Sequence, residues 1–90
     1  MNKIRLMSRP GALTQDLANR NYSSWVNFHE ALIQLRIAKG LTQADVAHEL
    51  GISQSAVSQF ESLNRLPNLQ TVFLYALVVG AKLDFSISES

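Results

Sequence analysis

Apolar residues recur at helical spacing along most of the chain, and capping residues and glycines divide that pattern into separate helices. The longest predicted helix covers residues 23–39. Shorter helices are predicted over residues 42–50, 53–61 and 68–79. A brief helix, beginning at Thr14 and ending around residues 19–21, is expected before them. The pattern therefore predicts an all-α fold.

Residues 41–61 carry the densest set of helix signals. Thr42 and Asp45 have the spacing of a capping box, and Gly51 supplies the left-handed residue at which a first helix can end. Ser53 can cap a second helix directly afterwards, as Asn68 can cap the last one. Two capped helices joined by a glycine-centred turn, with apolar inner faces, form a helix-turn-helix.

The end of the chain changes from helical to alternating periodicity. Lys82–Ser88 alternates apolar and polar residues, which predicts a short half-buried strand. A solitary strand leaves its backbone groups unpaired, and the chain offers only a weak internal candidate near residues 3–7. Pairing with the same strand of a second copy would satisfy both edges and form a two-fold homodimer.

The preceding helix also favours a homodimer, because residues 72–79 are apolar on every side. The alternative is that the N-terminal segment covers this surface. Residues expected to face the domain interior are Leu69, Val72, Ala76 and Val79. Residues expected at the dimer interface are Leu74, Leu77, Val78, Leu83, Phe85 and Ile87.

These patterns divide the chain into an N-terminal arm over residues 1–22, a helix-turn-helix domain over residues 23–80, and a dimerisation strand and tail over residues 81–90. Its 90 residues and 47% apolar composition suit one small folded domain. The absence of cysteine fits a reducing cytoplasm, where we expect the protein to reside. No run approaches the roughly 18 apolar residues of a membrane span.

The outer face of the second motif helix is polar. It carries short hydroxyl and amide side chains that can donate to and accept from base edges: Gln54, Ser55, Ser58 and Gln59. The alternative is an ordinary solvated surface. The net charge of +1 is low for a nucleic-acid binder, and residues 42–61 contain no lysine or arginine. Phosphate contacts there would have to come from helix N-termini, hydroxyls and amides.

The sequence shows no pattern typical of metal binding or catalysis. His29 and His48 have no obvious partners at metal-ligand spacing, so no metal site is expected. The chain has no nucleophile elbow, paired carboxylates or glycine-rich phosphate loop. We therefore expect neither an enzyme nor a bound cofactor.

The stretch LRIAKGLTQADVAHELGISQSAVSQFE, residues 35–61, resembles the Cro/CI (XRE) family of helix-turn-helix proteins. The resemblance extends over roughly residues 28–80, and its caps, glycines and core positions agree in register. It implies a compact, lambda-repressor-like bundle of about five helices, whose second motif helix enters the major groove of double-stranded DNA. It also implies a repressor that binds a palindromic operator as a dimer.

The family pattern assigns roles to individual residues. It implies base contacts from Gln54, Ser55 and Gln59, with Ser58 nearby. It places five residues near phosphates: Thr42, Gln43, Ser53, Asn64 and Arg65. It also implies an ion pair between Arg36 and Glu61, which would be costly to bury singly.

The loop after the motif departs from the family pattern. Many members have glycine two residues after the motif glutamate, where this chain has Leu63. A bulky residue at positive φ is strained, so we expect this loop to take another course. That expectation weakens the roles assigned to Asn64 and Arg65.

The tail from Val78 to Ile87 resembles HipB-type antitoxins, and HigA-type antitoxins are related candidates. In such proteins a C-terminal strand pairs across the dimer, and the dimer represses its own operon while binding a toxin protein. A stand-alone phage or metabolic regulator, and a protein-interaction adaptor, remain alternatives.

Overall fold

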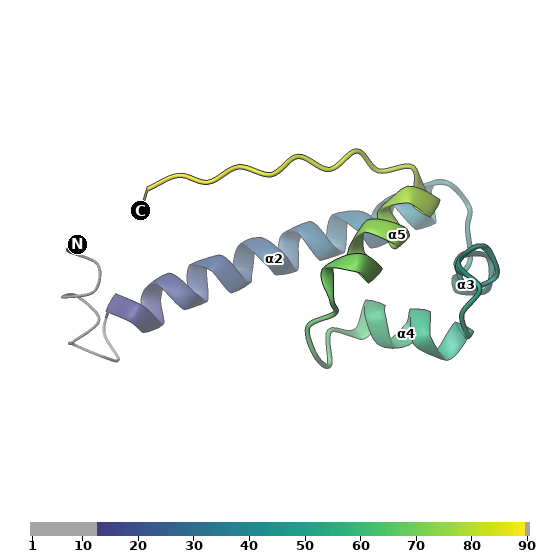
Figure 1. The fold of residues 1–90 in the computed structure, drawn as a ribbon, viewed down its shortest axis with the longest axis horizontal. Helices are drawn as coiled ribbons and strands as arrows, with labels where there is room; N and C mark the ends of the chain where they lie inside the picture. The colour runs from purple at the N-terminus through teal and green to yellow at the C-terminus, as the bar shows by residue number, and fades with distance from the viewer. Residues whose placement is uncertain (1–12, 90) are drawn as a thin grey trace. The chain divides into compact units, whose positions relative to one another are not determined.

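The computed structural model describes residues 13–89, with side chains from residue 18 onward. The strand candidate near residues 3–7, and the first part of the arm predicted over residues 1–22, lie outside the described residues. The described elements are four helices: α2 (Leu13–Ala38), α3 (Gln43–Leu50), α4 (Gln54–Ser62) and α5 (Leu69–Val79) (Figure 1). The all-α prediction is confirmed.

The chain divides into two units after Glu30. The first unit contributes the N-terminal part of α2, where the Trp25 ring lies 5.9 Å from Phe28 and 5.4 Å from His29, measured between centroids. The second unit, from Ala31 onward, contains the last turns of α2 together with α3, α4, α5 and the C-terminal segment.

The break predicted between a brief helix and a helix beginning at residue 23 is wrong. α2 is continuous from Leu13 to Ala38, because no glycine or proline interrupts this stretch. The polar run over residues 19–24, which suggested a break, is an exposed part of the helix surface. The described residues consequently contain four helices rather than about five.

The core of the second unit is formed by one apolar stripe from each of its helices. α3 contributes Val46 and α4 contributes Val57, and both side chains are at most 1% exposed. The Phe60 ring of α4 packs against Tyr75 of α5 with centroids 4.5 Å apart. Burial of each such side chain is worth about 1.5–3 kcal/mol relative to leaving it in water. This core fixes α3 and α4 against α5.

The inward stripe of α5 differs from the predicted one at two positions. Val72, Ala76 and Val79 are buried as expected, but Leu69 is 63% exposed. Leu69 is the first residue of α5, so it lies beyond the edge of the core. Tyr75 is buried on the same stripe because its hydroxyl donates a hydrogen bond to a carboxylate of α4.

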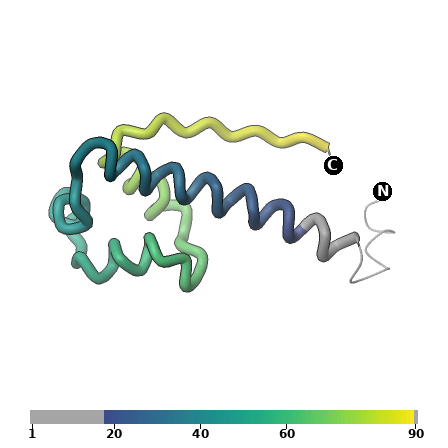
Figure 2. Tube along the Cα trace, turned by 180° about the vertical axis from the view of Figure 1, so that it is seen from behind, coloured from purple at the N-terminus to yellow at the C-terminus, as the bar shows by residue number. Residues whose placement is uncertain are grey.

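The C-terminal segment, residues 81–89, is an extended run after α5 (Figures 1 and 2). The strand predicted over Lys82–Ser88 does not form within the single chain, because no second strand lies among the described residues to pair with it. The Phe85 ring meets Phe73 of α5 edge to face, with centroids 6.0 Å apart. None of the described helices combines the length and the apolar composition needed to span a membrane.

The loop after α4 also corrects an expectation. Leu63 ends α4 in the left-handed conformation, with φ 58° and ψ 26°, so the loop keeps the course that glycine would give it. A non-glycine residue in this region costs about 1–2 kcal/mol. It persists where the surrounding structure over-determines it, and here the Leu63 side chain is half-buried.

Leu63→Gly is expected to be more stable than Leu63→Ala by about 1 kcal/mol, the reverse of their order inside a helix. Both variants lose the leucine side chain, so the difference between them isolates the cost of the left-handed backbone. Urea denaturation of the two variants measures it. Equal stabilities, or a more stable alanine variant, would show that residue 63 bears no such strain.

Candidate nucleic-acid interface

The predicted capping box is confirmed, and it fixes the start of α3. The Thr42 hydroxyl oxygen accepts a hydrogen bond from the Asp45 amide at 3.0 Å, and the Thr42 amide donates to the Asp45 carboxylate at 2.8 Å. These two bonds lower the pKa of Asp45, since they favour its charged form. Gly51 then ends α3 in the left-handed conformation at φ 68°. The turn between α3 and α4 is therefore set by local chemistry.

α4 begins in the same way. The Ser53 hydroxyl oxygen accepts from the Ala56 amide at 3.1 Å, so Gln54 is the first helical residue. Of the predicted phosphate-contacting residues, Thr42 and Ser53 thus also serve as N-caps. Each cap hydroxyl still has its own proton to donate, because the capping bond uses only an oxygen lone pair.

The predicted base-contacting residues share one exposed side of α4. At about 100° per residue they occupy an arc of about 140°, opposite the buried residues Val57 and Phe60. We call this arc the α4 polar face, and its members are Gln54, Ser55, Ser58 and Gln59. The structure therefore brings together the four residues named from sequence.

The orientation of α4 is set by the carboxylate of Glu61. Arg36, from the last turns of α2, donates to both carboxylate oxygens, at 2.7 and 3.0 Å. Tyr75 of α5 donates through its hydroxyl at 2.7 Å, and Gln43 of α3 donates through its amide at 3.1 Å. Arg36 also donates to the Leu41 carbonyl at 2.7 Å. One carboxylate consequently joins all four helices of the second unit.

The sequence named Arg36 and Glu61 as a pair but missed two other members of this network. Tyr75 lies in an apolar run, and its inward helical spacing was the available signal. Gln43, which was expected near phosphates, also donates a hydrogen bond from its amide nitrogen to Glu61. No sequence spacing reports that contact, which joins residues 18 positions apart.

The network also determines the charge state of its members. Burial raises the pKa of Glu61, but the hydrogen bonds from Arg36, Tyr75 and Gln43 outweigh it and hold that pKa below its usual value. Burial and the adjacent carboxylate raise the pKa of Tyr75. At neutral pH the network therefore contains a carboxylate, a guanidinium and a neutral phenol.

The loop after α4 places Asn64 and Arg65 on the surface. Arg65 lines a shallow groove with Gln59 of α4 and with Asn68, the N-cap of α5. A cation thus lies beside the α4 polar face, in the loop that begins at the left-handed residue Leu63.

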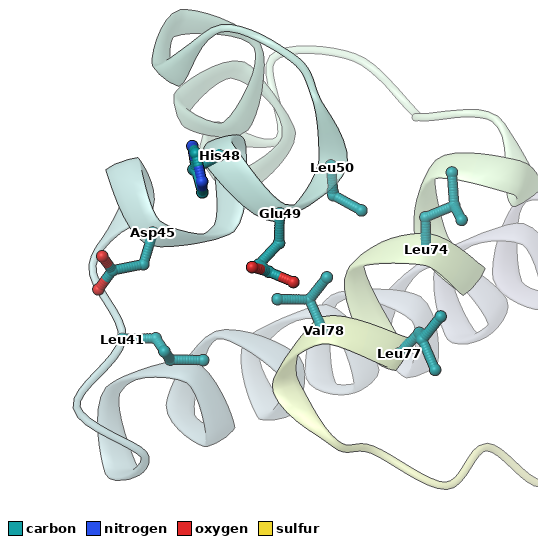
Figure 3. Close-up of a pocket in the computed structure, with 8 residues that line it drawn as sticks. All are labelled: Leu41, Asp45, His48, Glu49, Leu50, Leu74, Leu77 and Val78. Carbon is teal, nitrogen blue, oxygen red and sulfur yellow. The ribbon is translucent and has the colours of Figure 1, made fainter.

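A second groove lies between α3 and α5 (Figure 3). Its α5 wall is formed by three residues predicted for the dimer interface, Leu74, Leu77 and Val78. Its α3 side carries the acidic residues Asp45 and Glu49. The remaining lining residues are Leu41, His48 and Leu50. Among the side chains described, residues 18–89, no cluster of His, Asp and Glu could hold a metal ion.

Glu61→Gln is expected to lower the free energy of unfolding at pH 7 by about 3 kcal/mol, because it leaves Arg36 part-buried without a counter-charge. The depressed pKa of Glu61 contributes stability above its unfolded value of about 4.3, and that contribution is lost as pH falls through the folded pKa. The difference in free energy of unfolding between the parent protein and the Glu61→Gln variant should therefore become smaller in acid.

Urea denaturation over a pH series measures this difference, with Glu49→Gln, at an exposed glutamate of α3, as the matched control. The control variant should remain close to the parent at every pH. The role assigned to Glu61 would be contradicted if both variants lost the same free energy of unfolding. It would also be contradicted if the difference between the parent and Glu61→Gln stayed constant as the pH fell.

Comparison with known proteins agrees with this geometry. A helix-turn-helix family model matches residues 32–85, more than half of the chain. The HTH-type transcriptional activator BcrR of Enterococcus faecalis is 40% identical over 63 residues, a region that covers 70% of this chain and 31% of that protein. No solved structure matches the chain. The chain belongs to the helix-turn-helix family.

Proposed function

We propose that this protein is a homodimeric transcription regulator in which α4 of each copy enters the major groove of a palindromic operator. The observation that carries the proposal is the α4 polar face, an exposed arc of amides and hydroxyls. Such groups discriminate bases through hydrogen bonds to their edges. Because Glu61 joins α4 to the other helices, the face is presented on a rigid element.

In this proposal, the bases are contacted by Gln54, Ser55, Ser58 and Gln59. The phosphates are contacted by Thr42, Gln43, Ser53, Asn64 and Arg65. Hydroxyls, amides and helix N-termini are established phosphate ligands. The Gln43 amide nitrogen has a second N–H group, which can donate a hydrogen bond to a phosphate while the first continues to donate to Glu61. Salt dependence of binding should be modest, since Arg65 is the only cation in this set.

The proposed dimer brings together the C-terminal segments of two copies as antiparallel strands. The single chain leaves the apolar side chains of this segment largely in water, with Phe85 69% and Ile87 99% exposed. Leu77 on the neighbouring α5 wall is 74% exposed. Pairing would bury these side chains and would satisfy the backbone groups of residues 81–89. Two α4 helices would then read half-sites whose centres lie about 34–36 Å apart.

We further propose that the dimer represses its own promoter, because a protein bound across an operator excludes other proteins from it. The relative BcrR is named an activator, which favours activation as the second candidate. A promoter–reporter fusion carrying the DNA upstream of the gene separates the two. Reporter output should fall when the protein is supplied, and a rise would establish activation instead.

An antitoxin role is a further candidate, in which a toxin protein rather than the α5 surface of a second copy occupies the groove between α3 and α5. Asp45 and Glu49 on its rim would repel DNA phosphates, so this side suits a protein partner. A toxin protein encoded beside the gene should then co-purify with the chain, and Leu50→Asp in the groove should release it while leaving operator binding intact. Absence of co-purification identifies a stand-alone regulator.

Gln54→Ala and Gln59→Ala are each expected to weaken binding to the cognate operator by about 1–3 kcal/mol and to relax base preference. Fluorescence anisotropy with DNA from upstream of the gene, beside scrambled DNA and at two salt concentrations, measures both effects. Gln70→Ala, at an exposed glutamine of α5, is the matched control. Equal weakening on every DNA would contradict base readout, and absence of binding by the parent protein would favour the protein-interaction adaptor.

Ile87→Asp is expected to convert the dimer to a monomer, because it places a charge in the apolar row of the paired strands. Ser86→Asp adds the same charge on the alternate side of the segment and should leave the dimer intact. Sedimentation equilibrium measures the mass of each variant. If both variants keep the dimer mass, these strands do not form the interface, and a monomeric parent protein would overturn the dimer itself.

A further inference from the structure

The α4 polar face has a restricted hydrogen-bonding chemistry. It presents two amides and two hydroxyls, and residues 42–61 contain no lysine or arginine. Arginine or lysine is the usual partner of guanine, which offers two acceptors, N7 and O6, in the major groove. Aspartate or glutamate is the usual partner of the cytosine amino group. Glu61 is the acid of α4, and both of its oxygens are already bound.

The two amides of the face are unengaged within the described chain. Gln54 and Gln59 are exposed, and neither side-chain amide makes a hydrogen bond to another described residue, although the Gln59 backbone carbonyl accepts one from the Ser62 hydroxyl. By contrast, the Gln43 amide already donates one hydrogen bond to Glu61, and the Ser53 hydroxyl oxygen already accepts one from the Ala56 amide. Gln54 and Gln59 therefore keep both a donor and an acceptor for a base.

A carboxamide presents its donor and its acceptor side by side. Adenine offers the complementary arrangement, an acceptor at N7 beside a donor at N6, so the pair makes two hydrogen bonds. On guanine the amide oxygen would face the O6 acceptor, and one of the two bonds would be lost. Serine hydroxyls bond to any of these edges, so Ser55 and Ser58 discriminate less.

The spacing of the amides separates their targets. Five residues of helix rise roughly 7.5 Å, and base pairs are stacked about 3.4 Å apart. Gln54 and Gln59 can therefore reach base pairs about two steps apart when α4 lies along the groove.

We infer that each operator half-site presents adenine to Gln54 and to Gln59, so that the protein selects A·T pairs at these two positions. This inference rests on the proposed reading of DNA by α4. It adds the identity of the bases. Adenine is indicated because the face offers two amides without a described partner and lacks the arginine, lysine or available carboxylate that would select guanine or cytosine.

Selection of binding sites from a randomised DNA library tests the inference with the full-length chain. The parent protein should enrich a motif with adenine at two positions per half-site. Gln54→Ala should reduce the preference for adenine about tenfold at one position, and Gln59→Ala should reduce it about tenfold at the other. The Gln70→Ala control should select the parental motif.

Chemical substitution of the selected DNA provides the second measurement. Replacing the adenine at one of these positions by 7-deazaadenine removes the N7 acceptor and should weaken parent binding several-fold. The same replacement should have no effect on the variant that lacks the corresponding glutamine. This thermodynamic cycle assigns each base to one side chain.

The outcomes separate the inference from the function on which it rests. Failure to enrich any motif would overturn the proposed DNA reading itself. An enriched motif that is G·C at both positions, or that does not respond to the glutamine substitutions, would overturn the adenine assignment and leave DNA binding in place.

Discussion

The hydrogen bonds to the Glu61 carboxylate hold the second unit together. A partly buried carboxylate is unfavourable alone, and this one is stabilised by donors from the end of α2, from α3 and from α5. Apolar packing by residues such as Val57 fixes how closely the helices approach, but it tolerates rotation and sliding. The directional bonds to Glu61 restrict those motions. Since Glu61 lies on α4 itself, they also determine which side of α4 faces solvent.

A neutral reading surface has a physical consequence for recognition. Proteins that rely on many cations bind any DNA strongly, so their specific sites compete with a large nonspecific background. The motif in this chain carries no lysine or arginine over residues 42–61, so its contribution to nonspecific attraction is small. In the proposed complex with DNA, hydrogen bonds to base edges would then make up a larger share of the binding free energy. In the proposed complex, specificity would gain at the expense of affinity, and the second copy of the proposed dimer would add affinity.

The sequence was sufficient for features that depend on neighbouring residues. The capping box at Thr42 and the left-handed glycine at Gly51 were both predicted, because each involves contacts within a few positions. The α4 polar face followed from helical periodicity. The remaining features depend on distant residues: the sequence did not show that Gln43 and Tyr75 join the Glu61 network or that Leu69 lies beyond the core. Leu63 shows the same limit, since its own preference is overridden by the packing around it.

The exposed C-terminal segment has a further consequence for the solubility of the chain. An extended run with alternating apolar residues and unpaired backbone groups, ending at the almost fully exposed Ile87, resembles the edges at which β-aggregates grow. The acidic residues Asp84 and Glu89 flank its apolar centre and oppose such growth by mutual repulsion between chains. These two carboxylates therefore have the placement of gatekeeper residues, which disfavour edge-to-edge association of exposed extended segments.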